Sequence, residues 1–216
     1  MADIKGVIFD LDGTIIDSMW VWDKIDFNFL NKRNISVPNN LKNEIEHFGF
    51  DETAHYFKRT FNLEESVNDI KKEWMDMAFR EYSECIKLKP GIKTFLDMLK
   101  NTNTKIGLAT SNCHYLLEPV LKNNDIYHYF DAITITDEVS RGKSFPDVYL
   151  LCCSKLGLTP NQCAVFEDIL PAIKGAKSAG MKVIAIEDQY CDYSKDDLLK
   201  YADEYIADYN NYNLQM

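Results

Sequence analysis

The chain has 216 residues, of which 46% are hydrophobic and 27% charged, and its formal net charge is -10. These proportions are those of an average soluble globular protein, and the length allows a full hydrophobic core plus a small second domain. Because so acidic a surface repels nucleic acid phosphates and anionic membranes, we expect neither nucleic acid nor a membrane as a partner.

The first predicted strand covers residues 4–9, and two acids follow it in the run Asp10-Leu11-Asp12-Gly13-Thr14. Asp10 and Asp12 are two residues apart, so their side chains lie on the same side of an extended chain. Gly13 allows the backbone to turn tightly there. An Asp-x-Asp run alone is weak evidence of a site, because turns are rich in Asp.

From residue 18 to residue 87 the pattern is helical and lacks convincing strands. Lys89-Pro90-Gly91 then marks a return to strands alternating with helices. We therefore expect a helical domain of residues 18–87 inserted into a core domain of residues 1–17 and 88–216. Its predicted helices cover residues 19–32, 40–46, 52–61 and 65–85.

The inserted domain contains aromatic and histidine side chains whose roles the sequence leaves open. Trp20 or Trp22 can line a substrate pocket, but we favour a buried helix face formed by Met19, Trp22, Ile25 and Phe29. His47 is more typical of a surface or packing residue than of a functional one.

In the core domain, short apolar strands alternate with amphipathic helices, which is typical of a parallel sheet covered on both faces. We expect an α/β fold, a Rossmann-like three-layer sandwich, that binds its ligand at the carboxyl ends of the strands. The further strands are predicted at residues 105–109, 132–135, 164–166, 182–186 and 204–206, and the helices at 91–100, 115–123, 146–156 and 170–179.

Polar side chains follow the carboxyl ends of three of these strands. Such ends meet at one edge of a parallel sheet, so we expect the side chains to lie near Asp10 and Asp12. The joint arrangement is much more informative than any one of its parts. The residues are Thr110, Ser111 and Asn112 after residues 105–109, Lys143 in the loop after 132–135, and Glu167 and Asp168 after 164–166.

Acids gathered at one edge of the sheet repel one another unless a cation neutralises them. Oxygen ligands without His or Cys suit Mg²⁺, which takes one or two carboxylates and keeps several waters. We expect Asp10 and Asp168 to supply these carboxylates and Glu167 to hold a metal-bound water. An acidic protein would thereby gain the local positive charge that a phosphorylated substrate needs.

The same residues predict phosphoryl transfer. The Asp10 carboxylate can attack phosphorus to give an aspartyl-phosphate, and Asp12 can protonate the leaving oxygen and then activate water. Thr110 and Lys143 would stabilise the phosphoryl oxygens, with Ser111 and Asn112 as further contacts to the substrate phosphate.

These motifs resemble those of the haloacid dehalogenase-like hydrolase superfamily. The resemblance covers nearly the whole chain and is closest to the β-phosphoglucomutase and phosphoglycolate phosphatase branch, which carries a helical cap. It implies that Asp10 and Asp168 bind Mg²⁺ by side chain and Asp12 by its main-chain carbonyl. The four motifs are the run from Asp10 to Thr14, Thr110-Ser111-Asn112, Lys143 in Gly142-Lys143-Ser144-Phe145-Pro146-Asp147, and Phe166-Glu167-Asp168.

The chain departs from the branch pattern in three places. Ser144 stands where the lysine loop usually has a proline, and Ile169 and Ala172 stand where the fourth motif often has serine and glycine. Neither change removes a metal ligand, but both can reshape the pocket. In addition, the loop at residues 47–51 has no arginine where phosphosugar mutases place one, which favours hydrolysis over mutase activity.

We therefore expect a Mg²⁺-dependent phosphatase of a small phosphorylated metabolite. A phosphosugar mutase is the main alternative, and a dehalogenase or a non-catalytic binding protein on the same fold is less well supported. The six cysteines show no metal-site spacing and fit reduced thiols, and no secretion signal or membrane span is evident. These features predict a cytoplasmic monomer or weak dimer.

Overall fold

The computed structural model describes residues 3–45, 48–210 and 212–214. The chain divides into two compact units, of which one comprises Met1–Met19 with Ile86–Met216 and the other Trp20–Cys85. The first unit contains the strands and the second is helical. Each unit is described by itself below.

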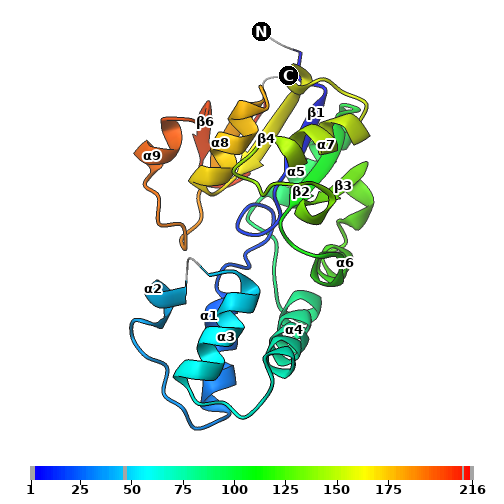
Figure 1. Ribbon diagram of the computed structural model, residues 1–216. Coiled ribbons are helices and arrows are strands. Elements are labelled where there is room, and N and C mark those ends of the chain that lie inside the picture. The colour runs from blue at the N-terminus through cyan, green and yellow to red at the C-terminus, as the bar shows by residue number, and fades with distance from the viewer. Residues whose placement is uncertain (1–2, 46–47, 211, 215–216) are drawn as a thin grey trace. The chain divides into compact units, whose positions relative to one another are not determined.

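Within the described residues of the first unit, six strands form one parallel sheet, in the order β3-β2-β1-β4-β5-β6 (Figure 1). This confirms the parallel sheet that the apolar runs predict, because all six runs form strands near their expected positions. The strands are β1 (Gly6–Phe9), β2 (Lys105–Thr110), β3 (Ala132–Ile135), β4 (Cys163–Glu167), β5 (Lys182–Ile186) and β6 (Glu204–Ile206).

The strand order reverses next to β1, and this reversal locates the site. β2 and β3 follow on one side of β1, whereas β4, β5 and β6 follow on the other. In such sheets the connections leave in opposite directions and open a crevice outside the carboxyl ends of the two central strands. Phe9 at the end of β1 is in register with Phe166 of β4. The residues that follow β1 and end β4 are therefore neighbours.

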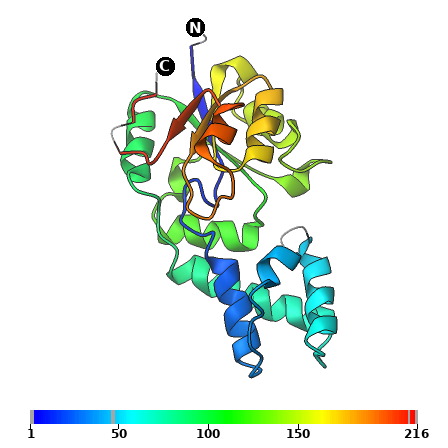
Figure 2. The ribbon, with the colours of Figure 1, turned by 90° about the vertical axis from the view of Figure 1, so that its left-hand side faces the viewer.

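Helices cover both faces of the sheet (Figures 1 and 2). On one face, Ile8 and Val165 pack in a buried cluster with α7 (Asp147–Lys155), α8 (Leu170–Ser178) and α9 (Lys195–Leu199). On the other, Phe9 stacks on Phe166 at a centroid distance of 5.0 Å. The alternation of Ile8 and Phe9 between faces follows from the two-residue period of a strand.

The second face is completed by α5 (Ile92–Asn101) and the C-terminal segment. The ring centroid of Phe95 in α5 lies 6.1 Å from that of Phe9, and the ring centroid of Tyr209 lies 5.5 Å from that of Phe95. α6 (His114–Asn123) follows β2, and short 3-10 helices lie at Tyr127–Tyr129, Thr136–Glu138 and Pro160–Gln162. The core domain is thus a three-layer α/β sandwich, as the sequence predicts.

The second unit consists of α1 (Val21–Asn31), α2 (Leu41–Ile45), α3 (Phe50–Thr60) and α4 (Val67–Glu84) in its described residues. Aromatic rings from three helices form its core. The Trp74 ring lies 4.8 Å from that of Phe57 and 5.5 Å from that of Phe29, and all three side chains are buried. Edge-on packing of this kind contributes beyond the area it buries.

The expected burial of Trp22 is wrong. Its side chain is 38% exposed and packs edge-on against Phe50, at a centroid distance of 5.8 Å. The buried row of α1 begins one residue earlier, at Val21, and continues through Ile25 and Phe29 at helical spacing. Met19 and Trp20 are half-buried. His47 lies outside the described residues.

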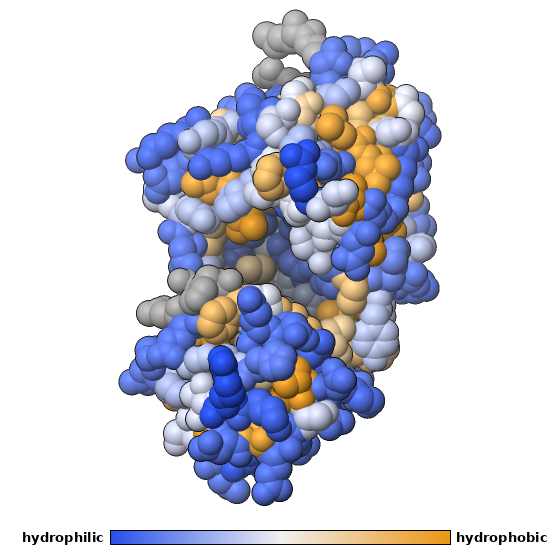
Figure 3. Space-filling view, viewed as in Figure 1, coloured by the Kyte–Doolittle hydropathy of each residue, from blue (hydrophilic) through white to orange (hydrophobic). Residues whose placement is uncertain are grey.

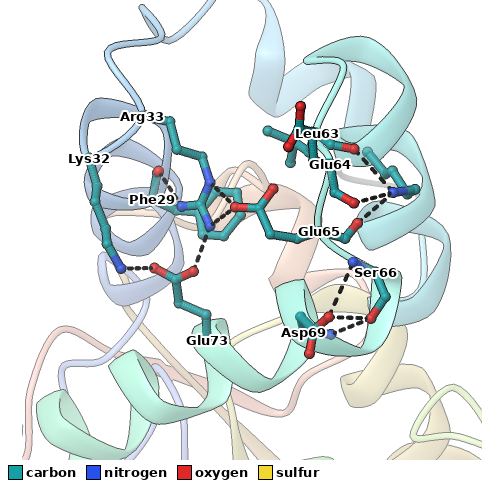
Figure 4. A network of polar contacts seen from close by, with 10 residues as sticks. Phe29, Lys32, Arg33, Leu63, Glu64, Glu65, Ser66, Asp69 and Glu73 are labelled. Atoms are coloured by element: carbon teal, nitrogen blue, oxygen red, sulfur yellow. Dashed lines mark hydrogen bonds and ion pairs between the residues drawn. The ribbon is translucent and has the colours of Figure 1, made fainter.

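A network of polar contacts joins α1 to the segment that leads into α4 (Figure 4). The Arg33 guanidinium donates to Glu65 at 2.7 Å and to Glu73 at 2.6 Å. At the start of α4, Ser66 and Asp69 form a capping box, each side chain accepting the backbone N–H of the other. The helical unit is therefore stabilised by contacts of its own.

The visible surface is mainly hydrophilic, with apolar side chains gathered in small patches on each unit (Figure 3). This agrees with the strongly acidic composition. A search of the described residues finds no helix with the length and apolar character that crossing a membrane requires.

Candidate active site

Three buried acids meet where the strand order reverses. Asp10 follows β1, Glu167 ends β4 and Asp168 comes next, and their exposed fractions are 6%, 0% and 2%. One carboxylate oxygen from each lies within 4.8 Å of the other two. The end-of-strand positions thus place acids that are 157 residues apart in one cluster, and this cluster can hold a metal ion.

Lys143 pairs with two of these acids. Its ammonium donates to one carboxylate oxygen of Asp10 and to Oε1 of Glu167, and the residue is 9% exposed. Burial lowers the pKa of Lys143, but the charges of Asp10 and Glu167 outweigh burial and raise it above its usual value. The lysine therefore keeps its charge at neutral pH.

One ammonium does not compensate three carboxylates. Burial raises the pKa of Asp10 to about 7, against the opposing charge of Lys143. Burial and the charge of Asp10 hold the pKa of Asp168 well above its usual range. Oε2 of Glu167 is buried and has no hydrogen-bond partner among the described residues. A hard divalent cation with its waters fits this donor set, because it supplies positive charge and donors together.

Gly13 brings the backbone beside Asp168. Its φ of +81° lies in the left-handed region, and an added Cβ would lie 2.3 Å from Oδ2 of Asp168. Another residue would be strained there and would displace the carboxylate. The tight turn after Asp12 that the sequence predicts is therefore also a close approach to the acids.

Asp12 is held apart from this cluster by its own donors. Ser18 Oγ donates to Oδ1 at 2.7 Å, and Asn112 Nδ2 donates to Oδ2 at 2.8 Å. Two donors fix the orientation of this carboxylate, as proton transfer in a set direction requires. The metal role expected of Asp12 concerns its main-chain carbonyl and stays a prediction.

The three polar residues at the end of β2, Thr110, Ser111 and Asn112, differ from one another in burial and hydrogen bonding. Thr110 is 1% exposed, and its hydroxyl accepts the backbone N–H of Asn112 at 2.9 Å. The Asn112 side chain binds Asp12 and also accepts the backbone N–H of Cys113 at 2.8 Å. Ser111 is exposed. Phosphate contact by these residues stays a prediction, and Asn112 additionally orients Asp12.

Several residues of the site were not singled out from the sequence. Thr14 Oγ1 donates to Asp168 Oδ1 at 3.0 Å, and the Tyr149 hydroxyl donates to Glu167 Oε1 at 2.8 Å. Thr14 belongs to the first motif, so its position in the sequence already indicated that it lies near the site. Tyr149 lies on the buried face of α7, where aromatic residues commonly pack in the core. The sequence around it therefore does not indicate a role in the site.

Replacing Tyr149 with phenylalanine should lower kcat by about 10- to 100-fold, because a hydrogen bond to a charged group contributes about 1.5–3 kcal/mol and each 1.4 kcal/mol is about tenfold in rate. The variant keeps the ring and removes the donor that positions Glu167. Steady-state phosphate release measures the effect. Tyr201→Phe, at a 43% exposed position, is the matched control and should behave as wild type. Equal rates for all three proteins would contradict a role for the Tyr149 hydroxyl.

Known proteins are similar to this chain in sequence. The family model of haloacid dehalogenase-like hydrolases matches residues 7–186. A phosphorylated carbohydrates phosphatase of Thermotoga maritima is 28% identical over 84% of this chain and 84% of its own length. The β-phosphoglucomutase of Bacillus subtilis is 34% identical over 85% of this chain and 83% of its own.

The fold of this chain is also similar to that of a solved structure. The crystal structure of a putative β-phosphoglucomutase from Thermotoga maritima superimposes with a TM-score of 0.84 at 26% identity and covers 94% of each chain. The match extends through both the strands and the helical residues 20–85, because so little of either chain is left out.

Proposed function

Because this chain belongs to the haloacid dehalogenase-like hydrolases, we propose that it is a Mg²⁺-dependent phosphatase of a small phosphorylated metabolite. The observation that carries the proposal is the cluster of Asp10, Glu167 and Asp168, two of which pair with the Lys143 ammonium. Sugar phosphates are the substrate class to examine first, since a relative is named a phosphorylated carbohydrates phosphatase.

In the proposed reaction, an Asp10 oxygen attacks phosphorus and the bond from phosphorus to the substrate oxygen breaks. Asp12 gives its proton to that leaving oxygen. It then takes a proton from the water that attacks the aspartyl-phosphate, which frees inorganic phosphate and restores the Asp10 carboxylate. Lys143 orients Asp10 and stabilises the phosphoryl oxygens.

Asp10, Asp168 and the main-chain carbonyl of Asp12 would hold the Mg²⁺, with Glu167 as the acceptor for one of its waters. When bound, the ion neutralises charge on the phosphoryl oxygens. The surroundings of Asp10 and Asp168 disfavour negative charge without it, because burial raises the pKa of both acids.

We propose residues 18–87 as a cap domain that excludes water and selects the substrate. Trp22 and Phe50 are exposed aromatic side chains of the helical unit and are in contact with each other. Exposed aromatic rings suit the apolar faces of a sugar. This assignment separates phosphate chemistry, in the core domain, from substrate choice.

A phosphosugar mutase is the second candidate, and the 34% identity to a β-phosphoglucomutase favours it. A mutase must hold a second phosphate, and the loop at residues 47–51 has no arginine for that purpose. The two activities differ in their product. A mutase interconverts sugar monophosphates in the presence of a bisphosphate activator, whereas a phosphatase releases inorganic phosphate.

A substrate screen tests the proposal. The protein is incubated with Mg²⁺ and an aryl phosphate, sugar phosphates, nucleotides or phosphoglycolate, and inorganic phosphate is measured. We expect release from the aryl phosphate and faster release from one metabolite class. Sugar phosphate interconversion without net release would identify the mutase instead, and no turnover of any compound would contradict both candidates.

Mg²⁺ should raise the Tm of the protein, and more so at about pH 8 than at about pH 5. The pKa of Asp10 rises from 3.8 to about 7 on folding, so the folded state binds its proton more tightly than the unfolded state. Stability from this group is therefore lost as pH rises between these values. A cation offsets the repulsion once the acids are ionised. Thermal melts with Mg²⁺ or a chelator at both pH values measure the difference.

The Asp168→Asn variant provides the matched comparison. It removes one of the repelling acids, so the metal-free variant should melt above wild type at about pH 8 and gain little from Mg²⁺. Asp137→Asn changes an exposed acid and should respond to Mg²⁺ as wild type does. An equal Mg²⁺ effect in Asp168→Asn and wild type would remove Asp168 from the metal site.

A further inference from the structure

The lysine loop, residues 142–146, lies against the backbone of α8 at Gly175. A Cβ added at Gly175 would lie 2.0 Å from the carbonyl oxygen of Lys143 and 2.9 Å from that of Phe145. The carbonyl carbon of Lys143 would follow at 3.1 Å. These are backbone atoms, so no side-chain rotation relieves the overlap. Position 175 admits only glycine unless the loop or the helix moves.

The backbone conformation of α8 does not require a glycine at position 175. Gly175 lies in the interior of α8, and its φ is not among the positive values found in the chain. Glycine in a helix interior is less favourable than alanine, because it loses more conformational freedom on folding. Its presence is therefore explained by the close approach of the loop rather than by the local backbone.

We propose that Gly175 is a positioning residue for Lys143. The absent side chain lets the Lys143 carbonyl rest on α8, and this contact sets the point from which the ammonium reaches Asp10 and Glu167. The catalytic consequence rests on the proposed phosphatase function, whereas the packing itself does not.

The same helix directly follows Glu167, one of the two acids that Lys143 binds. β4 ends at Glu167, and α8 begins at Leu170 with Ile169 as its N-cap residue. The lysine loop therefore packs on the element that is joined through Asp168 and Ile169 to Glu167. We expect this packing to keep the spacing between Lys143 and Glu167 constant.

Two departures from the branch pattern lie in the two elements that make this contact. Ala172 stands in α8 where the fourth motif often has glycine, and Ser144 stands in the lysine loop where a proline is usual. In α8 a glycine is found three residues later, about one turn along the helix, and it is there that the loop backbone approaches.

Gly175→Ala is the test variant. Bringing a Cβ out to an ordinary contact of 3.4 Å from the Lys143 oxygen requires a displacement of more than an ångström. A misplacement of about 1 Å at a catalytic group lowers the rate by up to about 10²-fold. We expect kcat for phosphate release to fall by at least about tenfold, with Tm lowered although alanine ordinarily favours a helix.

Gly142→Ala is the matched control, since it adds the same methyl group to the same loop. Apart from its chain neighbours, no described heavy atom lies within 4 Å of a Cβ at position 142, and its φ is not positive. We expect kcat and Tm close to those of wild type. Equal losses in both variants would overturn the proposal, because the loss would then reflect any change in the loop.

Two further readouts separate positioning from a general loss of structure. If Gly175 acts through Lys143, then Gly175→Ala should cause no additional loss of kcat in a Lys143→Met background. Hydrogen exchange should increase in residues 142–146 of Gly175→Ala and stay unchanged in Gly142→Ala. An additive loss of kcat, or unchanged exchange in the loop, would overturn the proposal.

The proposal remains testable if Gly175→Ala does not fold or if the protein is not a phosphatase. A crystal structure of the wild-type chain then decides. We expect the ideal Cβ position at residue 175 to overlap the Lys143 carbonyl, whereas clearance beyond 3.4 Å from every loop backbone atom would overturn the proposal. A wild-type protein without turnover would contradict the proposed function and leave this structural test intact.

Discussion

Replacing Asp10 with asparagine should abolish phosphate release, lowering kcat by at least about 10³-fold. The asparagine side chain has nearly the same shape but is a poor nucleophile, and it cannot supply the charge that pairs with the Lys143 ammonium. The loss should appear in kcat for every substrate, because the same atom attacks phosphorus in each reaction. Phosphate release under saturating Mg²⁺ and substrate measures it.

The Asp10→Asn protein should remain folded. It loses a buried acid whose ionisation is unfavourable in the folded state, so its metal-free Tm should not fall at neutral pH. Asp137→Asn, at an exposed acid beyond β3, should keep wild-type turnover. Full activity in a purified, sequence-verified Asp10→Asn protein would exclude covalent catalysis by Asp10.

Asp12→Asn should lower kcat by about 10²–10⁴-fold, which is the usual contribution of a positioned acid or base. Asparagine cannot give a proton to the leaving oxygen or accept one from water. It keeps the main-chain carbonyl, so the variant should still bind Mg²⁺ and show the same Mg²⁺-induced rise in Tm as wild type. Phosphate release and thermal melts on one preparation give both readouts.

Ser18→Ala is a graded companion to this variant, because it removes one of the donors that orient Asp12 and leaves the carboxylate in place. It should lower kcat by much less than Asp12→Asn. A substrate with a very acidic leaving group needs little protonation and should lose the least turnover in Asp12→Asn. If Asp12→Asn turned over all substrates at the wild-type rate, Asp12 would have no acid or base role.

The core domain could be predicted from the sequence because its strands are short apolar runs in an alternating pattern. All six runs form strands, and the acids after residues 4–9 and 164–166 meet at the reversal of strand order. This success follows from a fold rule, since the carboxyl ends of parallel strands share one edge. Asp10, Glu167 and Asp168 are close for that reason.

Side-chain contacts within the site could not be predicted in the same way. The pairing of Lys143 with both Asp10 and Glu167 depends on how a loop packs on α8, which residue spacing does not report. The sequence indicates only a core residue at Tyr149, whereas the structure shows that its hydroxyl donates to Glu167. Such contacts join residues distant in sequence.

The misplaced Trp22 shows the limit of helical periodicity. Ile25 and Phe29 are buried, as expected, but the residue that precedes them in the buried row is Val21 and not Trp22. Where apolar residues occupy adjacent positions, the period alone does not choose between two faces. Tertiary packing against α4 decides, and it leaves Trp22 exposed.

An acidic chain can act on phosphates if its positive charge is local. Lys143 is buried among the acids, and burial raises the pKa of both Asp10 and Asp168, so their surroundings disfavour the ionised carboxylates. The net charge of -10 is a sum over the whole chain and does not report this local pairing of charges. A divalent cation would offset the charge of these acids once they are ionised.

We propose above all that Asp10 carries the phosphoryl group during turnover. Mixing the wild-type protein with Mg²⁺ and its best substrate, stopping the reaction with acid within one turnover and analysing peptides by mass spectrometry tests it most directly. We expect the peptide containing Asp10 to gain the mass of one phosphoryl group, and to lose it again as inorganic phosphate appears. Phosphate release with no phosphorylated peptide at any time, together with an active Asp10→Asn variant, would contradict the account.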